Sequence, residues 1–349
     1  MIHDPKGEWL RTSYNPATDL IFAPFDQRTC AWDLWADFSI HPELKHSLVA
    51  TAVNNHLNAH SDNFWRDSAT ELLKTAISEN NIFLAKQYLL TKKNKNQNDR
   101  TFQSIFSAAM AAFRDIAIIQ LTTTQTNIVK KTIDDFLSHS GCVFLLNNPS
   151  CSQEQNSSLS LLLSAFMLQA ISLSDVKKAN DLRAAVIMDE ALTFQLPNYI
   201  EKAIFSQSRS KGLCIVASAQ HIPDSTHNEQ GLWARQASNI FAMKVSDLKT
   251  REEMTKRIGK IVFNETQVSE NIPTDLTANN SFTKSEIQRQ HNVINPESFG
   301  ALKNREFILF HENGIAPGIV LNVDGEQDDT IKTIEYRERK DVIEFMKDF

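Results

Sequence analysis

Two adjacent acids, Asp189 and Glu190, end a short apolar run of the chain. The run, Ala184 to Met188, is too short for a helix and rich enough in Val and Ile for a strand buried on both faces. In open α/β sheets the ligand crevice lies beyond the carboxyl ends of the strands, so acids there face a site. In nucleotide-hydrolysing motors an Asp in this place holds Mg²⁺ through its water shell, and the Glu polarises the attacking water. The alternative is that the acids only cap the strand end.

A second apolar run, Leu213 to Ser218, follows Lys211-Gly212 and ends at Ala219-Gln220. The segment between the two runs is long enough for one helix, so the three elements are predicted to form a βαβ unit. Parallel strands end at the same edge of a sheet, which places Gln220 in the neighbourhood of the acid pair. This second polar strand end favours a functional site over a simple cap.

The composition is that of an ordinary globular protein. The chain has 349 residues, enough for two or more domains, with 42% hydrophobic and 22% charged residues. The formal net charge of −6 gives no overall basic surface, so nucleic-acid binding would have to be local or shared among subunits.

The cysteines and the hydropathy of the chain indicate which cellular compartment the protein occupies. The four cysteines have no metal-ligand spacing and are predicted to be reduced thiols in a cytosolic chain; they are Cys30, Cys142, Cys151 and Cys214. We expect no stretch to reach the roughly 18 to 20 apolar residues of a membrane span. The first residues, Met1 to Pro5, do not form a signal peptide.

Apolar residues at three- and four-residue spacing predict helices between residues 43 and 138. The predicted helices are Leu44 to Leu57, Phe64 to Ile77, Ile82 to Leu90, Thr101 to Ile119 and Ile128 to Ser138. The Lys- and Asn-rich stretch Thr91 to Thr101 is predicted to be a solvated loop, and its lysines a wet surface more than a phosphate contact.

Strand patterns lie on both sides of this helical segment. Strand ends are predicted near Ile2 and Ile21, strands at Gly141 to Asn147 and Ile240 to Val245, and a terminal hairpin at Phe307 to Phe310 with Gly318 to Leu321. Helices are predicted at Ser157 to Ser174, Pro197 to Gln207 and Thr250 to Ile258. The polar segment Val262 to Ser285 is predicted to be a loop, and the tail from Gln327 a marginal amphipathic helix containing Ile331, Ile334, Val342, Ile343 and Phe345. Packing is the favoured role of Trp32 and Trp35.

The ordered set of motifs resembles the type IV secretion coupling proteins of the TraD family, hexameric motor ATPases that feed conjugative DNA into a secretion channel. The matching segments are Asp4-Pro5-Lys6-Gly7-Glu8, Phe25-Asp26-Gln27-Arg28, Trp32-Asp33, Phe64-Trp65, Val186 to Glu190, Arg209 to Leu213, Ala219-Gln220 and Asn295 to Phe299. The resemblance covers about residues 1 to 322. It implies an α/β fold, a RecA/FtsK-like P-loop NTPase-type sheet flanked by helices, with an inserted all-α domain.

The resemblance also implies roles for individual residues. Asp189 and Glu190 match the Walker B acids, Asp189 holding Mg²⁺ through water and Glu190 activating the water nucleophile. Gln220 matches the residue that senses the γ-phosphate. Arg209 stands where the family places a basic residue that reaches the adjacent subunit's nucleotide as an arginine finger; a solvated arginine near a helix end is the alternative.

Two residues near the start complete the expected site. Asp4 and Lys6 would lie beside the nucleotide pocket, and turn geometry at Pro5 to Gly7 is the alternative explanation for them. ATP and Mg²⁺ are the cofactors that the family implies.

The chain departs from the family in one large respect. Family members carry a P-loop just before the Asp-Pro-Lys-Gly segment, whose backbone N–H groups and Lys bind the phosphates. None of the nine glycines here belongs to such a motif. We therefore expect the P-loop, its strand and any membrane helices to lie upstream of Met1, and we expect this chain alone not to hydrolyse ATP appreciably.

The predicted domains follow from the resemblance. Residues 1–42 and 139–322 would form the nucleotide-binding-type domain, residues 43–138 the inserted all-α domain, and residues 323–349 a charged tail. The implied partners are single-stranded DNA bound without sequence preference, relaxase and relaxosome proteins, the secretion channel and identical subunits of a hexamer. The location would be cytoplasmic, at the inner face of the bacterial inner membrane, with membrane contact only through an upstream region or partners.

Three functions remain open at this point. The first is the cytoplasmic part of a DNA-transfer motor. The second is a non-catalytic adaptor, derived from such a motor, that recruits protein or nucleoprotein substrates through the helical insert. The third, an unrelated α/β hydrolase, has no Ser/His/Asp elbow, no His ligand spacing and no Rossmann glycine fingerprint to support it.

Overall fold

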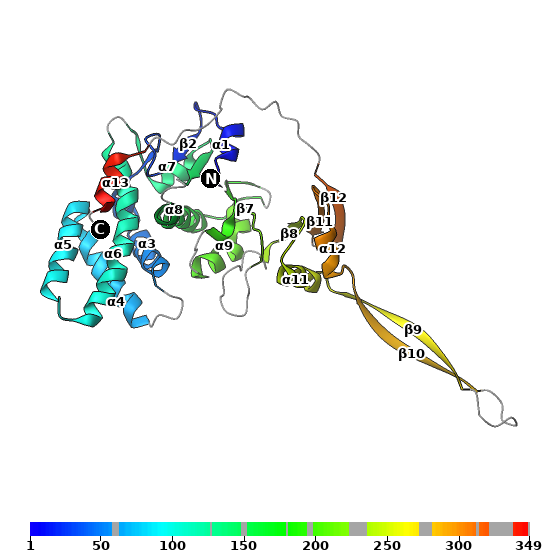
Figure 1. Cartoon of the computed structure of the whole chain (residues 1–349). Coiled ribbons are helices and arrows are strands. Elements are labelled where there is room, and N and C mark those ends of the chain that lie inside the picture. Colours follow the sequence, from blue (N-terminus) through cyan, green and yellow to red (C-terminus); the bar gives the residue numbers. More distant parts are fainter. Residues whose placement is uncertain are drawn as a thin grey trace. The chain divides into compact units, whose positions relative to one another are not determined.

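The computed structural model of the protein describes residues 1–57, 63–125, 128–147, 152–178, 181–193, 198–222, 236–271, 281–311, 314–320 and 338–347. These residues form two compact units (Figure 1). The first unit contains the described residues up to Ala219 and those from Glu338 onwards, and the second contains those from Gln220 to Val320.

The first unit is built on a five-stranded sheet in the order β2-β5-β1-β6-β7. The strands are β1 (Ile2–Asp4), β2 (Leu20–Phe22), β5 (Val143–Leu146), β6 (Ala184–Met188) and β7 (Leu213–Ala217). Every neighbouring pair is parallel, so all five carboxyl ends lie at one edge of the sheet. The predicted Asp189–Glu190 and Gln220 strands are confirmed as neighbours in this sheet.

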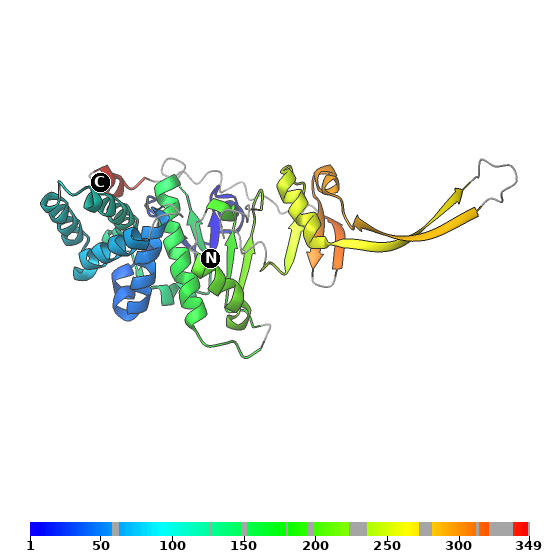
Figure 2. The same ribbon diagram turned by 90° about the horizontal axis from the view of Figure 1, so that it is seen from below.

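Alternating side chains send the two faces of the sheet into different cores, as the two-residue period of a strand requires. Phe144 and Leu146 pack with Leu10 of α1 (Glu8–Ser13) on one face. Val143 and Leu145 belong to the larger core on the other face. Helices α8 (Ser152–Ser172) and α9 (Asn198–Lys211) contribute to that larger core (Figures 1 and 2).

The inserted helical part shares this larger core with the sheet. Its elements are β3 (Ala31–Trp32), α2 (Leu34–Ile40), α3 (Pro42–Asn55), α4 (Asn63–Ala76), η1 (Ile77–Glu79), α5 (Ile82–Lys95), α6 (Arg100–Gln120), η2 (Leu121–Thr124), β4 (Lys130–Lys131) and α7 (Ile133–Ser138). Small residues such as Ala69 and Ala109 are fully buried where α4 packs on α6, which allows the two helices to approach closely. Trp32 is completely buried, so its predicted packing role is confirmed.

One helical stretch, Arg100 to Thr124, is long and apolar enough to cross a membrane by length and composition alone. This stretch differs from our expectation that none would reach that length. It comprises α6 and η2, and 78% of its apolar window is buried inside the protein. Contacts with α3, α4, α5 and α8 surround it, which explains why it is apolar on so many sides.

The carboxy-terminal residues dock onto the helical part. The Arg339 side chain is 2% exposed, and its Nη2 donates to the carbonyl of Leu121 at 3.0 Å. The helix that follows, α13 (Lys340–Lys347), buries Val342 completely and places Phe345 against Phe83. The amphipathic helix predicted for the tail is therefore confirmed at its end, while Ile331 and Ile334 lie outside the described residues.

The second unit has a three-stranded antiparallel sheet in the order β12-β11-β8. Its elements are β8 (Asn239–Ala242), α11 (Leu248–Ile258), α12 (Pro296–Ala301), β11 (Glu306–His311) and β12 (Gly314–Ile319). Ala242, Met254, Phe299 and Ile308 form its small core. The predicted terminal hairpin is confirmed as β11 and β12.

A long two-stranded ribbon is inserted between α11 and α12. Strands β9 (Lys260–Asn271) and β10 (Ser281–Asn292) pair antiparallel along their whole length and extend away from the rest of their unit (Figures 1 and 2). The prediction of a loop at Val262 to Ser285 is therefore wrong. The ribbon side chains whose burial is described are almost all exposed. Such strands need no apolar alternation, which is the pattern that predicts a strand. Most of the predicted loop centre, residues 272–280, lies outside the described residues.

Two further predictions in the helical part are corrected. The predicted loop Thr91 to Thr101 is mostly helical, because α5 continues to Lys95 and α6 begins at Arg100, where Asp99 accepts from the backbone N–H of Phe102. The predicted helix Ile128 to Ser138 begins only at Ile133, because Thr132 and Asp135 form a capping box there.

The predicted domain boundaries stay a prediction. The two compact units divide the chain near residue 220 instead, since the helical segment 43–138 shares one continuous core with the sheet.

Candidate functional site

Polar side chains from four adjacent strands meet at the carboxyl edge of the five-stranded sheet. Asn147 follows β5, His3 lies on β1, Asp189 follows β6 and Ser218 follows β7. Hydrogen bonds link His3 and Ser218 to Asp189. Since ligand crevices of open α/β sheets lie at this edge, the cluster is the candidate site.

Ser218 holds the Asp189 carboxylate in place. Its hydroxyl donates to Asp189 Oδ1 at 2.6 Å and accepts from the backbone N–H of Glu190 at 3.2 Å. The β6–β7 ladder continues past both strand ends, with Ala191 N–H donating to the Ser218 carbonyl at 2.8 Å. Glu190 adopts a left-handed backbone conformation with φ of 54°, uncommon for a side chain of this type. The turn that carries the two acids is thus fixed from β7.

His3 holds the same turn from the other side. Its ring is 1% exposed, and Nδ1 lies 2.6 Å from the carbonyl oxygen of Asp189. Because a carbonyl only accepts, Nδ1 carries the proton. Burial lowers the pKa of His3, and the hydrogen bond to the Asp189 carbonyl acts in the opposite direction. Next to β1, the side-chain amide of Asn147 donates to Asn156 of α8.

The Asp4 side chain is hydrogen-bonded to the backbone. Its carboxylate accepts from the N–H groups of Glu8 at 2.9 Å and Leu10 at 2.8 Å, at the start of α1. Its side chain is 1% exposed, and burial raises the pKa of Asp4 while these hydrogen bonds lower it. The turn interpretation therefore describes the contacts of Asp4 better than a ligand contact does.

Lys6 reaches the acid pair across the neighbouring strand end. Its Nζ lies 3.3 Å from Glu190 Oε1, with the side chains 59% and 30% exposed. The hydrogen bond to Glu190 raises the pKa of Lys6. The structure thus brings Lys6, Asp189 and Glu190 together in a solvent-accessible position, while their roles toward a nucleotide stay a prediction.

Arg209 and Gln220 stand apart from these contacts. Arg209 lies in the last turn of α9 with an exposed side chain, a placement that agrees with either of its two interpretations. Gln220 follows Ser218 closely in the chain and is also exposed, but it belongs to the second compact unit. Their roles stay predictions.

Sequence reasoning missed His3, Asn147 and Ser218. Each is a polar residue in or just after an apolar strand, which is the signal that drew attention to Asp189 and Gln220. Applied to every strand end, it would have found Asn147 and Ser218, whereas His3 lies within β1. Their partners could not be predicted, because strand order is a tertiary property.

The residues at this edge fit Mg²⁺ better than they fit a triphosphate. No group of three or more His, Cys, Asp or Glu in the described part of the chain can hold a metal directly, whereas one Asp acting through water suits the hydration of Mg²⁺. A phosphate cradle needs free backbone N–H groups in a glycine-rich loop. Gly7, the glycine nearest in sequence, donates its N–H to the Asp4 carbonyl at 3.3 Å and is used by that turn.

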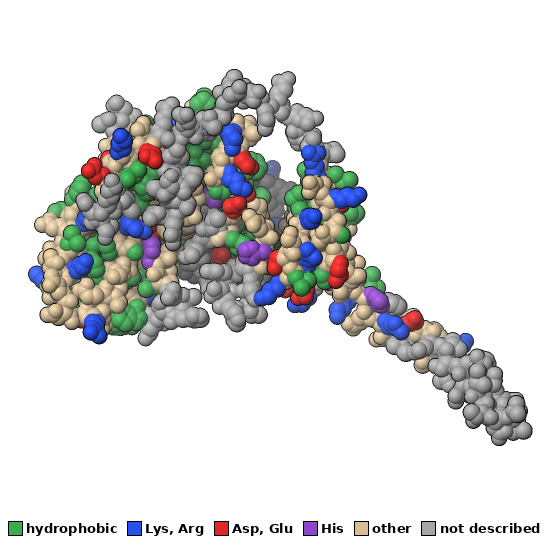
Figure 3. Space-filling view, in the orientation of Figure 1, with side chains coloured by type: hydrophobic (Ala, Val, Ile, Leu, Met, Phe, Trp, Pro, Cys, Tyr) green, Lys and Arg blue, Asp and Glu red, His purple; other side chains and the backbone are tan. Residues whose placement is uncertain are grey.

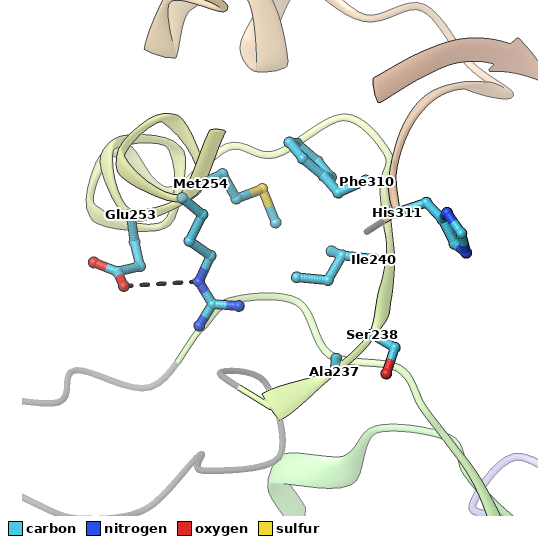
Figure 4. Close-up of a pocket in the computed structure, with 8 residues that line it drawn as sticks. Ala237, Ser238, Ile240, Glu253, Met254, Phe310 and His311 are labelled. Carbon is cyan, nitrogen blue, oxygen red and sulfur yellow. Dashed lines mark ion pairs between the residues drawn. The ribbon is translucent and has the colours of Figure 1, made fainter. Parts of the chain in front are cut away.

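A separate pocket of about 440 Å³ lies within the second unit (Figure 4). Ile240, Met254 and Phe310 form its apolar wall, and Glu253, ion-paired with Arg257 at 3.8 Å, lies at its rim. None of the site residues predicted from the sequence lines this pocket.

Comparison with known proteins decides the family. The model of the type IV secretion-system coupling protein DNA-binding domain matches residues 1–321. The chain belongs to this family. The coupling protein TraD of Escherichia coli (strain K12) is 30% identical over 76 residues, which span 22% of this chain and 10% of TraD.

Solved structures of a coupling protein, TrwB, share the fold. The unbound monoclinic form of TrwBΔN70 has a TM-score of 0.67 at 15% identity, covering 98% of this chain and 80% of that one. TrwB in complex with ADP and Mg²⁺ has a TM-score of 0.68 at 15% identity, covering 97% of this chain and 81% of that one. The predicted RecA-like α/β fold is thereby confirmed. TrwB, which shares this fold, has been solved in complex with ADP and Mg²⁺.

Proposed function

We propose that this coupling-protein chain is the Mg²⁺-ATP-processing and DNA-moving part of a conjugative motor, active once a phosphate-binding loop completes its site. One observation carries the proposal: Lys6, Asp189 and Glu190 converge at the carboxyl edge of a RecA-like sheet, with Asp189 fixed by Ser218. TrwB, of the same fold, is described in complex with ADP and Mg²⁺.

The side chains divide the chemistry between them. Asp189 would hold Mg²⁺ through its hydration shell, and Mg²⁺ supplies charge neutralisation for the phosphates. Glu190 accepts a proton from, or orients, the attacking water. Lys6 neutralises Glu190 while no nucleotide is bound, and its exposed, flexible side chain can leave when a phosphate competes. Gln220 and Arg209 are proposed to sense the γ-phosphate and to reach a neighbouring subunit's nucleotide.

DNA contact is proposed to arise in an oligomer. Lys and Arg side chains are interspersed with Asp and Glu on the face shown in Figure 3, in keeping with a net charge of −6. A channel lined by several subunits would concentrate basic groups that one subunit presents sparsely. Identical subunits, relaxosome proteins and the secretion channel are the proposed partners, at the cytoplasmic face of the inner membrane.

The test adds a phosphate-binding loop to the chain and then substitutes Glu190. The chain alone should show no Mg²⁺-dependent ATP hydrolysis. The same chain preceded by a family strand–P-loop–helix segment should hydrolyse ATP, and Glu190→Gln should abolish the rate. Glu8→Gln, a matched change on the exposed surface of α1, should leave the rate unchanged.

Two results would contradict the proposal. Hydrolysis of motor size by the chain alone would show that the site needs no added loop. Nucleotide turnover in the completed chain that persists in Glu190→Gln would show that the acid pair is not the catalytic group. Family membership favours the motor over an adaptor that never binds nucleotide.

A further inference from the structure

The pocket of the second unit has the size of a ligand-binding site. It lies between α11 and the paired ends of β8 and β11, and its volume of about 440 Å³ is within the usual range of small-molecule pockets. Native cores leave few voids larger than a water molecule, so a cavity of this size is not an ordinary packing defect. All of its lining residues belong to the second unit, which separates it from the acid pair of the first unit.

Local periodicity brings the apolar wall of the pocket together. Ile240 and Phe310 are opposite each other in the β8–β11 ladder, so both side chains lie on the same face of the sheet. Met254 and Arg257 are three residues apart on α11 and therefore lie on one face of that helix. Figure 4 shows Ile240, Met254 and Phe310 pointing into the pocket. Phe310 stacks on the fully buried Phe299, which fixes the aromatic part of the wall.

Arg257 adds a positive charge to this apolar wall. Its side chain is 20% exposed, and its Nε lies 3.8 Å from Glu253 Oε1, beyond hydrogen-bonding distance. The Glu253 side chain is 39% exposed, so it can turn into solvent at little cost. A carboxylate that enters the pocket can therefore take the place of Glu253. The planar fork of guanidinium N–H donors matches a carboxylate in shape and charge.

The surroundings also favour an aromatic anion. Residues 248–260, which are α11 and the two residues after it, include five basic and two acidic residues, whereas acidic residues outnumber basic ones in the whole chain. The sulfur of Met254 and the ring of Phe310 both make favourable contacts with an aromatic ring. Charge and wall together therefore fit a ring that carries a carboxylate better than they fit a cation.

We propose that this pocket binds a small aromatic carboxylate. Its ring packs against Ile240, Met254 and Phe310, and its carboxylate pairs with Arg257 in place of Glu253. The proposal goes beyond the nucleotide function and does not depend on it, because the two sites share no residue.

Titration of the full chain with 2-naphthoate tests the proposal without any nucleotide. Methionine labelled with ¹³C in its methyl group makes Met254 a direct reporter of ligand entry, and the volume-conserving variant Met254→Leu assigns its resonance. This resonance should shift in a saturable way. 2-Naphthamide, which has the same ring without the charge, should bind at least about tenfold more weakly, because the charge-assisted hydrogen bonds are lost.

Matched variants on α11 separate the pocket from general electrostatic attraction. Arg257→Gln should weaken 2-naphthoate binding at least about tenfold and leave 2-naphthamide binding within about twofold. Lys256→Gln removes the neighbouring charge, which does not line the pocket, and should change 2-naphthoate binding by less than about twofold.

The exchange of partners at Arg257 makes a prediction of opposite sign. Glu253→Gln should tighten 2-naphthoate binding by at least about threefold, because the competing carboxylate is gone. A variant that fails to fold cannot produce such a gain. Glu252→Gln, an equal change of charge on an exposed neighbour that does not line the pocket, should have little effect.

Four results would each overturn the proposal. An unshifted Met254 resonance would show that the pocket does not take the ligand. Equal affinities for 2-naphthoate and 2-naphthamide would show that the pocket takes a neutral apolar group, such as a partner's side chain. Unchanged 2-naphthoate binding in Arg257→Gln would exclude the pairing with Arg257, and the absence of a gain in Glu253→Gln would exclude the exchange.

Discussion

Residues at the site divide into those that hold the backbone and those that face a ligand. Asp4 and His3 are almost fully buried; both carboxylate oxygens of Asp4 accept from main-chain groups of α1, and His3 Nδ1 donates to the main chain of the acid turn. Lys6 and Glu190 keep substantial exposure and contact each other. Both pairs consist of charged or titratable residues next to a strand end. Only burial and hydrogen bonding therefore distinguish the residues that support the backbone from those that can contact a ligand.

Asp4→Ala should therefore lower the free energy of unfolding, by about 1–2 kcal/mol, because two N–H groups at the start of α1 lose their acceptor. Lys6→Ala, two residues away, should leave the free energy of unfolding nearly unchanged, since its ion pair is exposed to solvent. Urea unfolding followed by circular dichroism measures both. Equal losses in the two variants would contradict the division.

Asp37 should give the first unit a pH-dependent stability. Its buried carboxylate accepts from the indole N–H of Trp32 at 2.5 Å and from the backbone N–H of Ile133 at 3.0 Å, and burial raises the pKa of Asp37 to about 6. A pKa above the unfolded value means that the native state binds the proton more tightly. Its stabilising contribution is complete below the unfolded pKa of 3.8 and is lost as the pH rises through about 6.

The loss across that window amounts to about 3 kcal/mol relative to Asp37→Asn, which does not titrate. Urea unfolding of both proteins between pH 4 and 7 measures this loss. The free energy of unfolding of the natural protein should fall relative to that of Asp37→Asn as the pH rises. Asp135→Asn is the control with opposite sign: the capping-box hydrogen bonds lower the pKa of Asp135, so its contribution is lost as the pH falls. A constant difference between the natural protein and Asp37→Asn would contradict the prediction.

At the scale of elements, the pattern of apolar residues predicted those helices and strands whose side chains are buried in a core. The strand Ala184 to Met188 and the helix before Gly259 were predicted almost residue by residue, because their side chains fill cores and because Gly259, at φ of 88°, ends the helix. Patterning failed where polar residues form regular structure without burial. The ribbon of β9 and β10 is the clearest case, since its described side chains are almost all exposed and its order comes from cross-strand pairing.

Removal of the ribbon should leave its unit folded. Val262 and Gln290 are opposite each other, so an Asn-Gly turn joining them replaces residues 263–289 and retains the base of the ribbon. The core around Met254, Phe299 and Ile308 lies outside the deleted segment. We expect the melting temperature measured by calorimetry to fall by no more than about 3 °C, since a two-stranded ribbon adds little stability of its own.

The control deletes the same connection one residue out of register, joining Ile261 to Gln290, which reverses the facing of the retained strand ends. This variant should be the less stable of the two. A loss of cooperative unfolding in the register-preserving variant would show that the ribbon is part of the core.

At the scale of the whole molecule, the sequence predicted the fold class and the strand that carries the acids, but not the division into units. Residues 43–138 look like a separate helical domain in the sequence, yet Ile116 and Leu73 share one core with Leu145 and Val186. The second unit has only a small core of its own around Phe299. Which helix face meets which strand depends on packing among distant segments, and single-sequence periodicity carries no information about it.

Charge is also a whole-molecule property, and it makes a prediction about DNA. With 36 Lys and Arg against 42 Asp and Glu, one chain should bind a fluorescein-labelled single-stranded oligonucleotide weakly, through phosphates alone. Fluorescence anisotropy should show affinity falling steeply between about 50 and about 200 mM salt, with a slope near −0.7 per phosphate contacted, and no preference between oligo-dT and mixed sequence. A translocating motor requires this indifference, because it must pass every sequence. Affinity that is unchanged by salt, or that discriminates among bases, would contradict a phosphate-directed contact and remove the support that charge gives to an oligomeric DNA channel.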